Sequence, residues 1–90
     1  MPAVVLEKGE FREKERFGPG TVNRGAVLLE CTWAGGDFEA GVMLGGIFRS
    51  GTFRDGVFWG GVWLGGSWSG GTWEHGFGSD GTYRPRGEHP

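Results

Sequence analysis

A five-residue pattern of small and apolar positions runs through most of the chain. Glycine recurs at every fifth position from 36 to 81, and a large apolar residue stands two positions later in nine of these ten units. The large residues are Phe38, Met43, Phe48, Phe53, Phe58, Trp63, Trp68, Trp73 and Tyr83. Gly78 interrupts the series, which predicts that the regular array ends there. A fixed short period indicates a repeat architecture.

Weaker copies of the pattern precede this array. Gly20 leads to Val22 and Gly25 leads to Val27, after which a one-residue insertion resets the phase and Cys31 leads to Trp33. Cys31 thus occupies a glycine position. We interpret it as a small residue packed against backbone, in preference to a reactive thiol.

Each unit predicts a short strand followed by a tight turn. Asp-Gly and Gly-Gly pairs are typical of turns, and Asp55 precedes Gly56 as Gly60 precedes Gly61. The intervening residues are rich in aromatic and β-branched types, which favour strands. Helix is disfavoured because each interior glycine costs about 1 kcal/mol relative to alanine. The sequence therefore predicts an all-β fold.

Two arrangements of these strands fit the pattern: a four-sided β-solenoid with 20 residues per turn, and an antiparallel meander of three-residue strands. GVMLG at 41–45 recurs as GVWLG at 61–65, and GTFRD at 51–55 recurs as GTWEH at 71–75. This register favours the solenoid and places Arg54 beside Glu74. Three-residue strands are also short for a free-standing meander. In the solenoid the aromatic residues point inward, and the preceding glycines leave room for them.

The repeat unit resembles a known family. Phe53, Phe58, Trp63 and Trp68 are bulky centres with a small residue two positions earlier, as in pentapeptide-repeat proteins, and the resemblance covers residues 20–84. It implies a right-handed, four-sided β-helix. The chain departs from that family in using glycine where alanine is usual, and Val, Thr or Ser where Asp or Asn is usual. A weaker resemblance is to MORN repeats, whose longer hairpin-based period is absent here.

The segments outside the array divide the chain into three parts. Residues 1–19 are expected to cap the solenoid, residues 20–84 to form the repeat domain, and residues 85–90 to form a C-terminal tail. Within the cap, Val4, Val5 and Leu6 predict a strand. Phe11 and Phe17 are expected to cover the first turn.

Composition and charge narrow the classes of partner. The 13 aromatic residues argue against disorder, despite 21 glycines. A net charge of −2 without a basic stripe gives no support for nucleic acid as a partner. No long apolar run predicts a membrane span, and the N-terminus lacks signal-peptide features. The single cysteine excludes an internal disulfide, and a cytoplasmic location is expected.

Candidate catalytic groups are scattered. Asp37, Glu39, Asp55, Glu74 and Asp80 fall at turns or solvent-facing positions, where no cleft is expected to pair two carboxylates. The two histidines, His75 and His89, have no nearby cysteine or acidic cluster that predicts a metal site. We therefore expect no enzyme activity and no cofactor.

Outward apolar residues are the remaining functional signal. In the 20-residue register Val42, Leu44, Val62 and Leu64 fall on one side, with Trp59 one corner away, which predicts a protein interface. The leading hypothesis is a non-enzymatic structural or assembly protein that associates with itself, including as a filament, or with another protein. The alternative is a binding module for carbohydrate or peptide. In the meander, Trp63, Trp68 and Trp73 would form an open aromatic platform for it.

Overall fold

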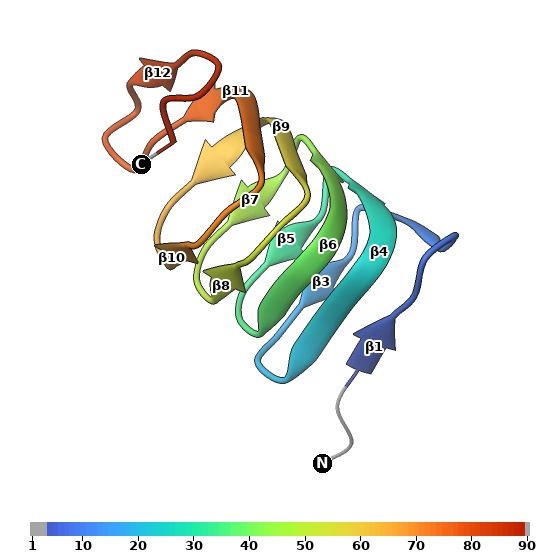
Figure 1. Cartoon of the computed structure of the whole chain (residues 1–90). Coiled ribbons are helices and arrows are strands. Elements are labelled where there is room, and N and C mark those ends of the chain that lie inside the picture. The colour runs from blue at the N-terminus through green and yellow to red at the C-terminus, as the bar shows by residue number, and fades with distance from the viewer. Residues whose placement is uncertain (1–3, 90) are drawn as a thin grey trace.

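Residues 4–89 form a β-solenoid of about five turns in the computed structural model (Figure 1). No helix occurs among these described residues. The strands are β1 (Val4–Leu6), β2 (Phe11–Glu13), β3 (Arg16–Phe17), β4 (Thr21–Leu29), β5 (Thr32–Trp33), β6 (Asp37–Leu44), β7 (Ile47–Phe48), β8 (Thr52–Phe53), β9 (Val57–Trp63), β10 (Ser67–Trp68), β11 (Thr72–Phe77) and β12 (Tyr83–Arg84).

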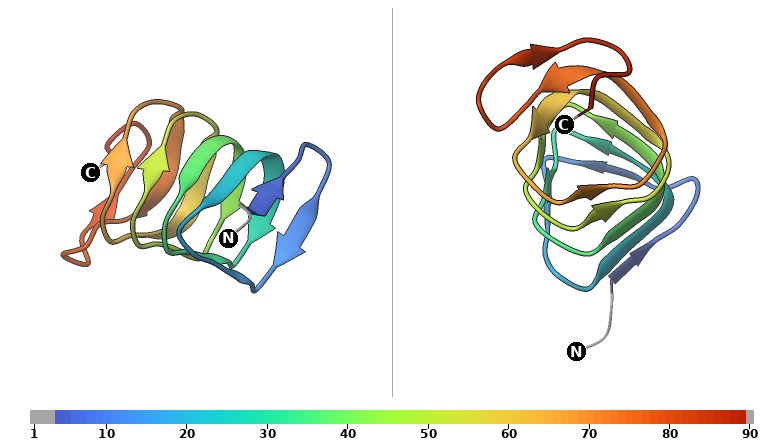
Figure 2. Two further views of the ribbon diagram at one scale, coloured as in Figure 1. Left: turned by 90° about the horizontal axis from the view of Figure 1, so that it is seen from below. Right: turned by 60° about the vertical axis from the view of Figure 1, so that its left-hand side comes forward.

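The strands of successive turns pair in parallel, which confirms the solenoid and rules out the antiparallel meander. Val42 lies beside Val57 and Val57 beside Thr72, while Ile47 lies beside Val62. Register partners are therefore about 15 residues apart, so one turn holds three five-residue units. The expected four-sided turn of 20 residues is wrong in this respect, and the cross-section has three sides. The right view of Figure 2 shows the turns stacked along one axis.

We number the three faces in the order in which the chain meets them. Face 1 contains β1, the first parts of β4 and β6, β8 and β10. Face 2 contains β2, the second parts of β4 and β6, and the first parts of β9 and β11. Face 3 contains β3, β5, β7 and the last parts of β9 and β11.

The 15-residue register also changes the expected ion pairs. Arg54 does not lie beside Glu74. Its guanidinium lies 3.9 Å from the Asp37 carboxylate on the preceding turn, while Glu74 lies 3.7 Å from Arg86. All four side chains are at least partly exposed, so these pairs contribute little to stability.

The N-terminal segment supplies the first turn of the stack. β1 and β2 pair with β4, and β3 pairs with β5, which confirms the strand expected at Val4–Leu6. Phe17 is buried against Trp33 with a ring separation of 5.8 Å, as expected of a residue that covers the first turn. Phe11 is 59% exposed, so the same expectation is wrong for Phe11.

No phase reset separates the second turn, residues 21–33, from the array. Asn23 lies beside Phe38 and Leu28 beside Met43, so Asn23 and Leu28 are the inward residues, in place of the expected Val22 and Val27. The glycine positions of this turn are taken by Thr21, Ala26 and Cys31, and all three are buried. The prediction that Cys31 packs as a small residue is confirmed. The inward Asn23 amide is satisfied by hydrogen bonds to the backbone of residues 25 and 26.

The core consists of three columns of inward side chains, one behind each face. Face 1 contributes Phe38, Phe53 and Trp68, face 2 contributes Met43, Phe58 and Trp73, and face 3 contributes Trp33, Phe48 and Trp63. Within a column the closest rings stack almost parallel, at 4.1–4.6 Å. This distance matches the spacing of neighbouring strands. Between columns the rings meet edge to face, an arrangement that aromatic quadrupoles favour.

The repeat glycines make room chiefly for backbone. A Cβ at Gly56 would lie 2.3 Å from the Gly41 carbonyl oxygen, and a Cβ at Gly61 would lie 2.6 Å from the Gly46 oxygen. The closest ring atom to a Cβ at Gly56 is farther away, at 3.1 Å on Phe38. Every fifth residue is thus glycine because the backbones of successive turns lie so close together there that no methyl group fits between them.

Candidate interaction surfaces

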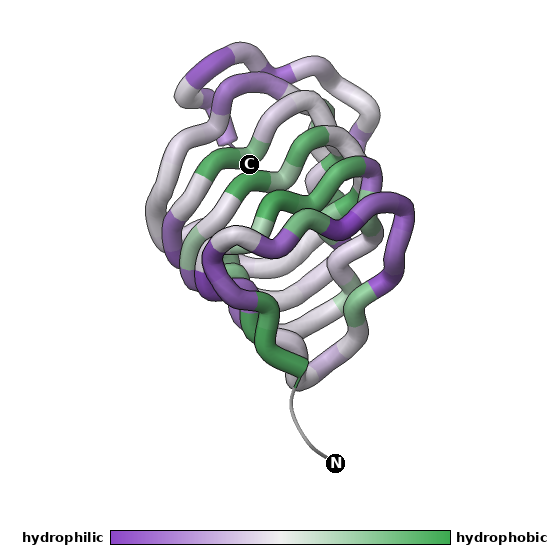
Figure 3. The backbone as a smooth tube through the Cα atoms, turned by 90° about the vertical axis from the view of Figure 1, so that its right-hand side faces the viewer, coloured by the Kyte–Doolittle hydropathy of each residue, from purple (hydrophilic) through white to green (hydrophobic). Residues whose placement is uncertain are grey.

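Face 2 carries apolar side chains outward as well as inward. One outward row contains Val27, Val42 and Val57, and the next contains Leu29, Leu44 and Trp59. The corresponding row of face 1 begins with Val5 and Val22 and then turns polar, with Asp37, Thr52 and Ser67. The next row of face 1 contains Arg24, Glu39 and Arg54. Figure 3 shows apolar segments of successive turns lying side by side. Face 2 therefore differs from an ordinary solvated sheet face.

A corner without side chains joins face 2 to face 3. Gly45 and Gly46 form it in one turn, and Gly60 and Gly61 form it in the next. The outward residues on either side are apolar. We call these residues the glycine-corner surface, which comprises Val42, Leu44, Ile47, Val57, Trp59, Val62, Leu64 and Phe77.

The five predicted interface residues all belong to this surface, but not in the expected arrangement. Val42, Leu44 and Trp59 lie on face 2, whereas Val62 and Leu64 lie on face 3 across the corner. The expectation that four of them share one side is wrong, because it rested on the 20-residue turn. Trp59 and Leu64 are the most exposed of the five, at 48% and 40%. Their role as an interface stays a prediction.

Sequence reasoning missed three members of the surface: Ile47, Val57 and Phe77. Ile47 and Phe77 are register partners of Val62, and Val57 is the register partner of Val42. Each lies 15 residues from its predicted neighbour. The signal was present in the sequence as apolar residues repeated at that separation.

A group of exposed rings extends the glycine-corner surface toward the C-terminal end. Trp59 contacts His75 at a ring separation of 6.0 Å, His75 contacts Tyr83 at 6.1 Å, and Tyr83 contacts Phe77 at 5.6 Å. The first and last pairs meet at 70° and 72°. Rings at such angles do not form a flat platform for a sugar.

The aromatic platform expected for the meander is also absent. Trp63 and Trp73 are 3% and 1% exposed, and both belong to the core columns. Trp68 is partly buried at the end of its column. These three rings therefore cannot together form an open binding face.

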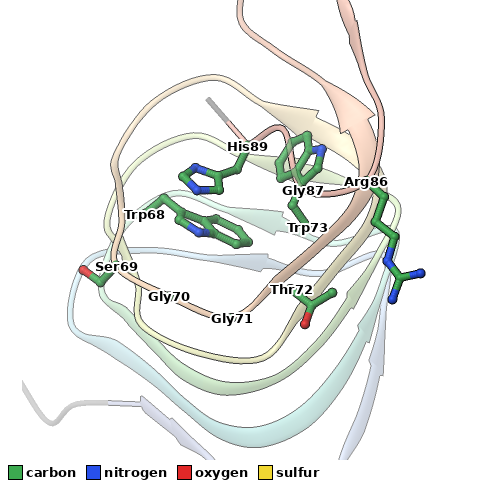
Figure 4. A pocket seen from close by; sticks show the side chains of 9 residues that line it. All are labelled: Trp68, Ser69, Gly70, Gly71, Thr72, Trp73, Arg86, Gly87 and His89. Carbon is green, nitrogen blue, oxygen red and sulfur yellow. The ribbon is translucent and has the colours of Figure 1, made fainter.

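A groove of about 540 Å³ lies at the C-terminal end of the solenoid (Figure 4). It is lined by Trp68, Ser69, Gly70, Gly71, Thr72, Trp73, Arg86, Gly87 and His89. The ring of Trp68 stacks on Phe53 at 4.5 Å on one side and on His89 at 4.8 Å on the other. The Gly87 N–H donates to the Trp73 carbonyl oxygen at 2.8 Å, which holds the tail against the last turn. We call this space the end groove.

The N-terminal end of the core is covered by charge. Arg12 stands in register with Leu28, at an inward position. Its guanidinium donates to the carboxylates of Glu10, at 3.1 Å, and Glu15, at 3.0 Å. The hydrogen bond that Glu10 accepts from the Glu7 N–H lowers the pKa of Glu10, and Arg12 lowers it further. An inward charge on an edge strand discourages further strand pairing.

Cys31 is buried with its Sγ 3.6 Å from the Arg12 carbonyl oxygen and 3.5 Å from that of Leu29. Burial raises the pKa of the thiol, because the thiolate would lose its solvation. The neutral thiol is therefore the form present in the folded protein near neutral pH. Among residues 4–89, no group of three or more His, Cys, Asp and Glu side chains is placed to hold a metal ion.

The environment of Cys31 predicts slow thiol chemistry. We expect a disulfide reagent at pH 8 to modify Cys31 at least about 100-fold more slowly in the folded protein than in urea, since the thiolate is the reactive form. The rate of modification is measured from the absorbance of the released reagent anion, with and without denaturant. Equal rates in the two conditions would show that the thiol is accessible.

Comparison with protein-family models, with curated proteins and with solved structures found no match. Within the described part of the chain, no helix is long and apolar enough to cross a membrane.

Proposed function

We propose that the chain is a non-enzymatic interaction module that associates with a second copy of itself, side by side, through the glycine-corner surface. The observation that carries this proposal is the difference between the faces. Apolar residues repeat outward in consecutive turns around one corner, while face 1 is polar from Asp37 onward. A contiguous exposed apolar patch of this kind is typical of a protein interface.

The size of the molecule decides how much of the corner is needed. A standard interface buries about 800 Å² on each partner. The described surface measures 4843 Å² in total, so such an interface would cover roughly a sixth of it. One face of a molecule 36 Å long and 23 Å wide is only about as large as this area, and no face is apolar throughout. Both faces that flank the corner are therefore expected to take part.

The two ends support sideways association over simple end-to-end stacking into a filament. Arg12 and its two carboxylate partners cover the first turn, and β12 leaves the parallel stack at the last turn. Within the described residues the outer side of β10 stays open at the last turn, but the charged first turn does not match it. The apolar corner is free of these features.

The repeat itself supports a distant kinship with pentapeptide repeats. The five-residue unit with a small and a bulky position is shared, while three units per turn and glycine at the small position set this chain apart. We propose that glycine permits the tighter three-sided turn and its Trp-rich core.

A charge placed on the glycine-corner surface should abolish self-association. We expect Trp59→Lys to raise the dimer dissociation constant at least about tenfold, because the lysine would have to be desolvated in an apolar interface. Sedimentation velocity over a range of concentrations measures this. The matched control is Thr52→Lys on polar face 1, which should behave as the parent protein. A parent protein that stays monomeric at high concentration would refute the proposed function.

Carbohydrate or peptide binding by a flat aromatic platform has less support. The buried rings are unavailable, and the exposed rings around Trp59 lie at steep angles to one another. Glycan binding that requires Trp59, without any self-association, would favour this alternative.

A further inference from the structure

The end groove occupies the position of a strand that the repeat rule calls for. On face 1, β8 pairs with β6 and β10 pairs with β8, each about 15 residues further along the chain. The next strand in this series would contain residues 82 and 83. Instead, β12 lies antiparallel to β11, outside the parallel stack. Within residues 4–89, no strand pairs with the outer side of β10.

The hydrogen bonds of the preceding turns define what this position would bind. Thr52 and Ser67 donate through their N–H groups to the carbonyl oxygens of Gly36 and Gly51, at 3.0 and 2.9 Å. One turn further, the equivalent acceptor is Gly66, and its donor would be Thr82. The Thr82 N–H donates instead to the Asp80 carboxylate, at 2.9 Å.

The packing of the turns restricts which segment can enter. A Cβ at Gly51 would lie 2.4 Å from the Gly36 oxygen, and a Cβ at Gly66 would lie 2.5 Å from the Gly51 oxygen. An incoming strand must therefore carry glycine where it crosses Gly66. Two residues later it must carry a flat ring to stack on Trp68, as Trp68 stacks on Phe53. The groove thus selects an extended Gly-x-aromatic segment.

The chain itself carries such a segment and holds it outside the parallel stack, where the Trp73 Nε1–H donates to the Arg84 carbonyl oxygen at 3.0 Å. Gly81 and Tyr83 obey the repeat rule, yet Tyr83 is 53% exposed on the outer surface. β12 makes a ladder of only two residue pairs with β11. Arg84 Nε is buried there without a hydrogen-bond partner, which disfavours this placement. The groove is covered meanwhile by the ring of His89.

We propose that the end groove is a strand-addition site for residues 81–84 of a second copy of this chain, which enter parallel to β10 and displace His89 from Trp68. Reciprocal exchange fills both grooves and gives a closed tail-to-tail dimer. Backbone hydrogen bonds to an exposed strand edge supply affinity, and the ring and glycine supply specificity. In the groove the incoming segment contacts none of the residues of the glycine-corner surface, although its release from β11 removes the contact of Tyr83 with Phe77. A chain that makes both two-fold contacts therefore forms an open assembly.

Cross-linking between two single-cysteine variants tests the exchange directly. The register places residue 84 of the incoming strand beside Ser69, about 4.8 Å away, a distance that a disulfide spans. We mix Ser69→Cys chains with Arg84→Cys chains, both in a Trp59→Lys, Cys31→Ala background. Mild oxidation should give the mixed dimer at least about tenfold faster than the pair Thr52→Cys and Arg84→Cys. Equal rates for the two pairs would overturn the proposal.

The Gly81→Asn variant distinguishes residues 81–84 in the hairpin with β11 from the same residues in the end groove of a second copy. A Cβ at Gly81 meets nothing within 4 Å in the hairpin, and asparagine tolerates its φ of 79°. In the groove the same Cβ would meet the Gly66 oxygen, so the mixed dimer should fall at least about tenfold. Gly9→Asn is the matched control, since Gly9 has a φ of 95° and open space. Cross-linking unaffected by Gly81→Asn would refute strand addition.

Experiments with a free tetrapeptide test whether the occupant of the end groove is a second copy of this chain or another polypeptide. Gly-Thr-Tyr-Arg should shift the Trp68 indole resonance in the Trp59→Lys variant and inhibit the mixed dimer, whereas Ala-Thr-Tyr-Arg should do neither. A shift by the first peptide without any mixed dimer between chains would overturn the second copy as occupant and assign the groove to another polypeptide. The Trp59→Lys background keeps these results independent of the glycine-corner contact.

Discussion

Gly61→Ala is expected to destabilise the solenoid by about 3 kcal/mol or more, as overpacking with forced backbone shifts does. The new Cβ would lie 2.6 Å from the Gly46 carbonyl oxygen, and the closest atoms are all backbone. Backbone in a stacked turn can move only by lengthening the hydrogen bonds of both neighbours. Since small domains are stable by only about 5–15 kcal/mol, this is a large fraction of the free energy of unfolding. Urea unfolding followed by circular dichroism measures the change.

Alanine variants of two further glycines distinguish the cost of the Cβ contact with backbone from the cost of a left-handed backbone conformation. Gly61 lacks the left-handed φ that most repeat glycines have, so its substitution tests the contact alone. Gly9 has a φ of 95° and no atom within 4 Å of a Cβ, so Gly9→Ala should cost only about 1 kcal/mol. Gly56 combines a φ of 113° with a Cβ contact of 2.3 Å, and its alanine variant should be the least stable. Equal losses at Gly9 and Gly61 would show that conformation, not the contact, requires glycine.

The core could be predicted from the five-residue pattern because one physical rule produces it. Every five-residue unit from Gly36 to Trp73 has a glycine where backbones meet and a large apolar residue two positions later, so the phase of Phe38 through Trp73 is unambiguous in the sequence. The rule says nothing about how many units close a turn, because all units obey it equally. The phase of the second turn was predicted wrongly because Thr21, Ala26 and Cys31 stand there at the positions where later turns have glycine.

The number of units per turn can be derived from the residues on either side of each inward residue. Val27 and Leu29, Val42 and Leu44, and Val57 and Trp59 are apolar pairs at a separation of 15 residues, and they mark one face. The match of residues 41–45 with 61–65 obscured this signal, because both segments flank the glycine corner on different faces. Gly78 correctly predicted the end of the regular array, but the end groove itself could not be predicted, because Gly81 and Tyr83 fit the repeat and yet lie outside the stack.

Phe53→Ala is expected to cost about 3–5 kcal/mol, the range for a buried aromatic side chain. The ring of Phe53 contacts five others: it stacks on Phe38 and Trp68 and meets Phe48, Phe58 and Trp63 edge to face. Its loss would leave a cavity where all three columns meet, and the stacked backbones leave neighbouring rings little freedom to fill it.

Trp68→Ala is the matched comparison within the same column, because Trp68 ends that column and lies partly exposed in the end groove. Water can enter the space that its ring leaves, so no closed cavity forms and the loss should be smaller than for Phe53→Ala. Urea unfolding of both variants gives the two free energies. A loss at Trp68 as large as that at Phe53 would mean that the column continues beyond Trp68 into a well-packed end. The groove would then be closed in solution, and strand addition at β10 would have no room.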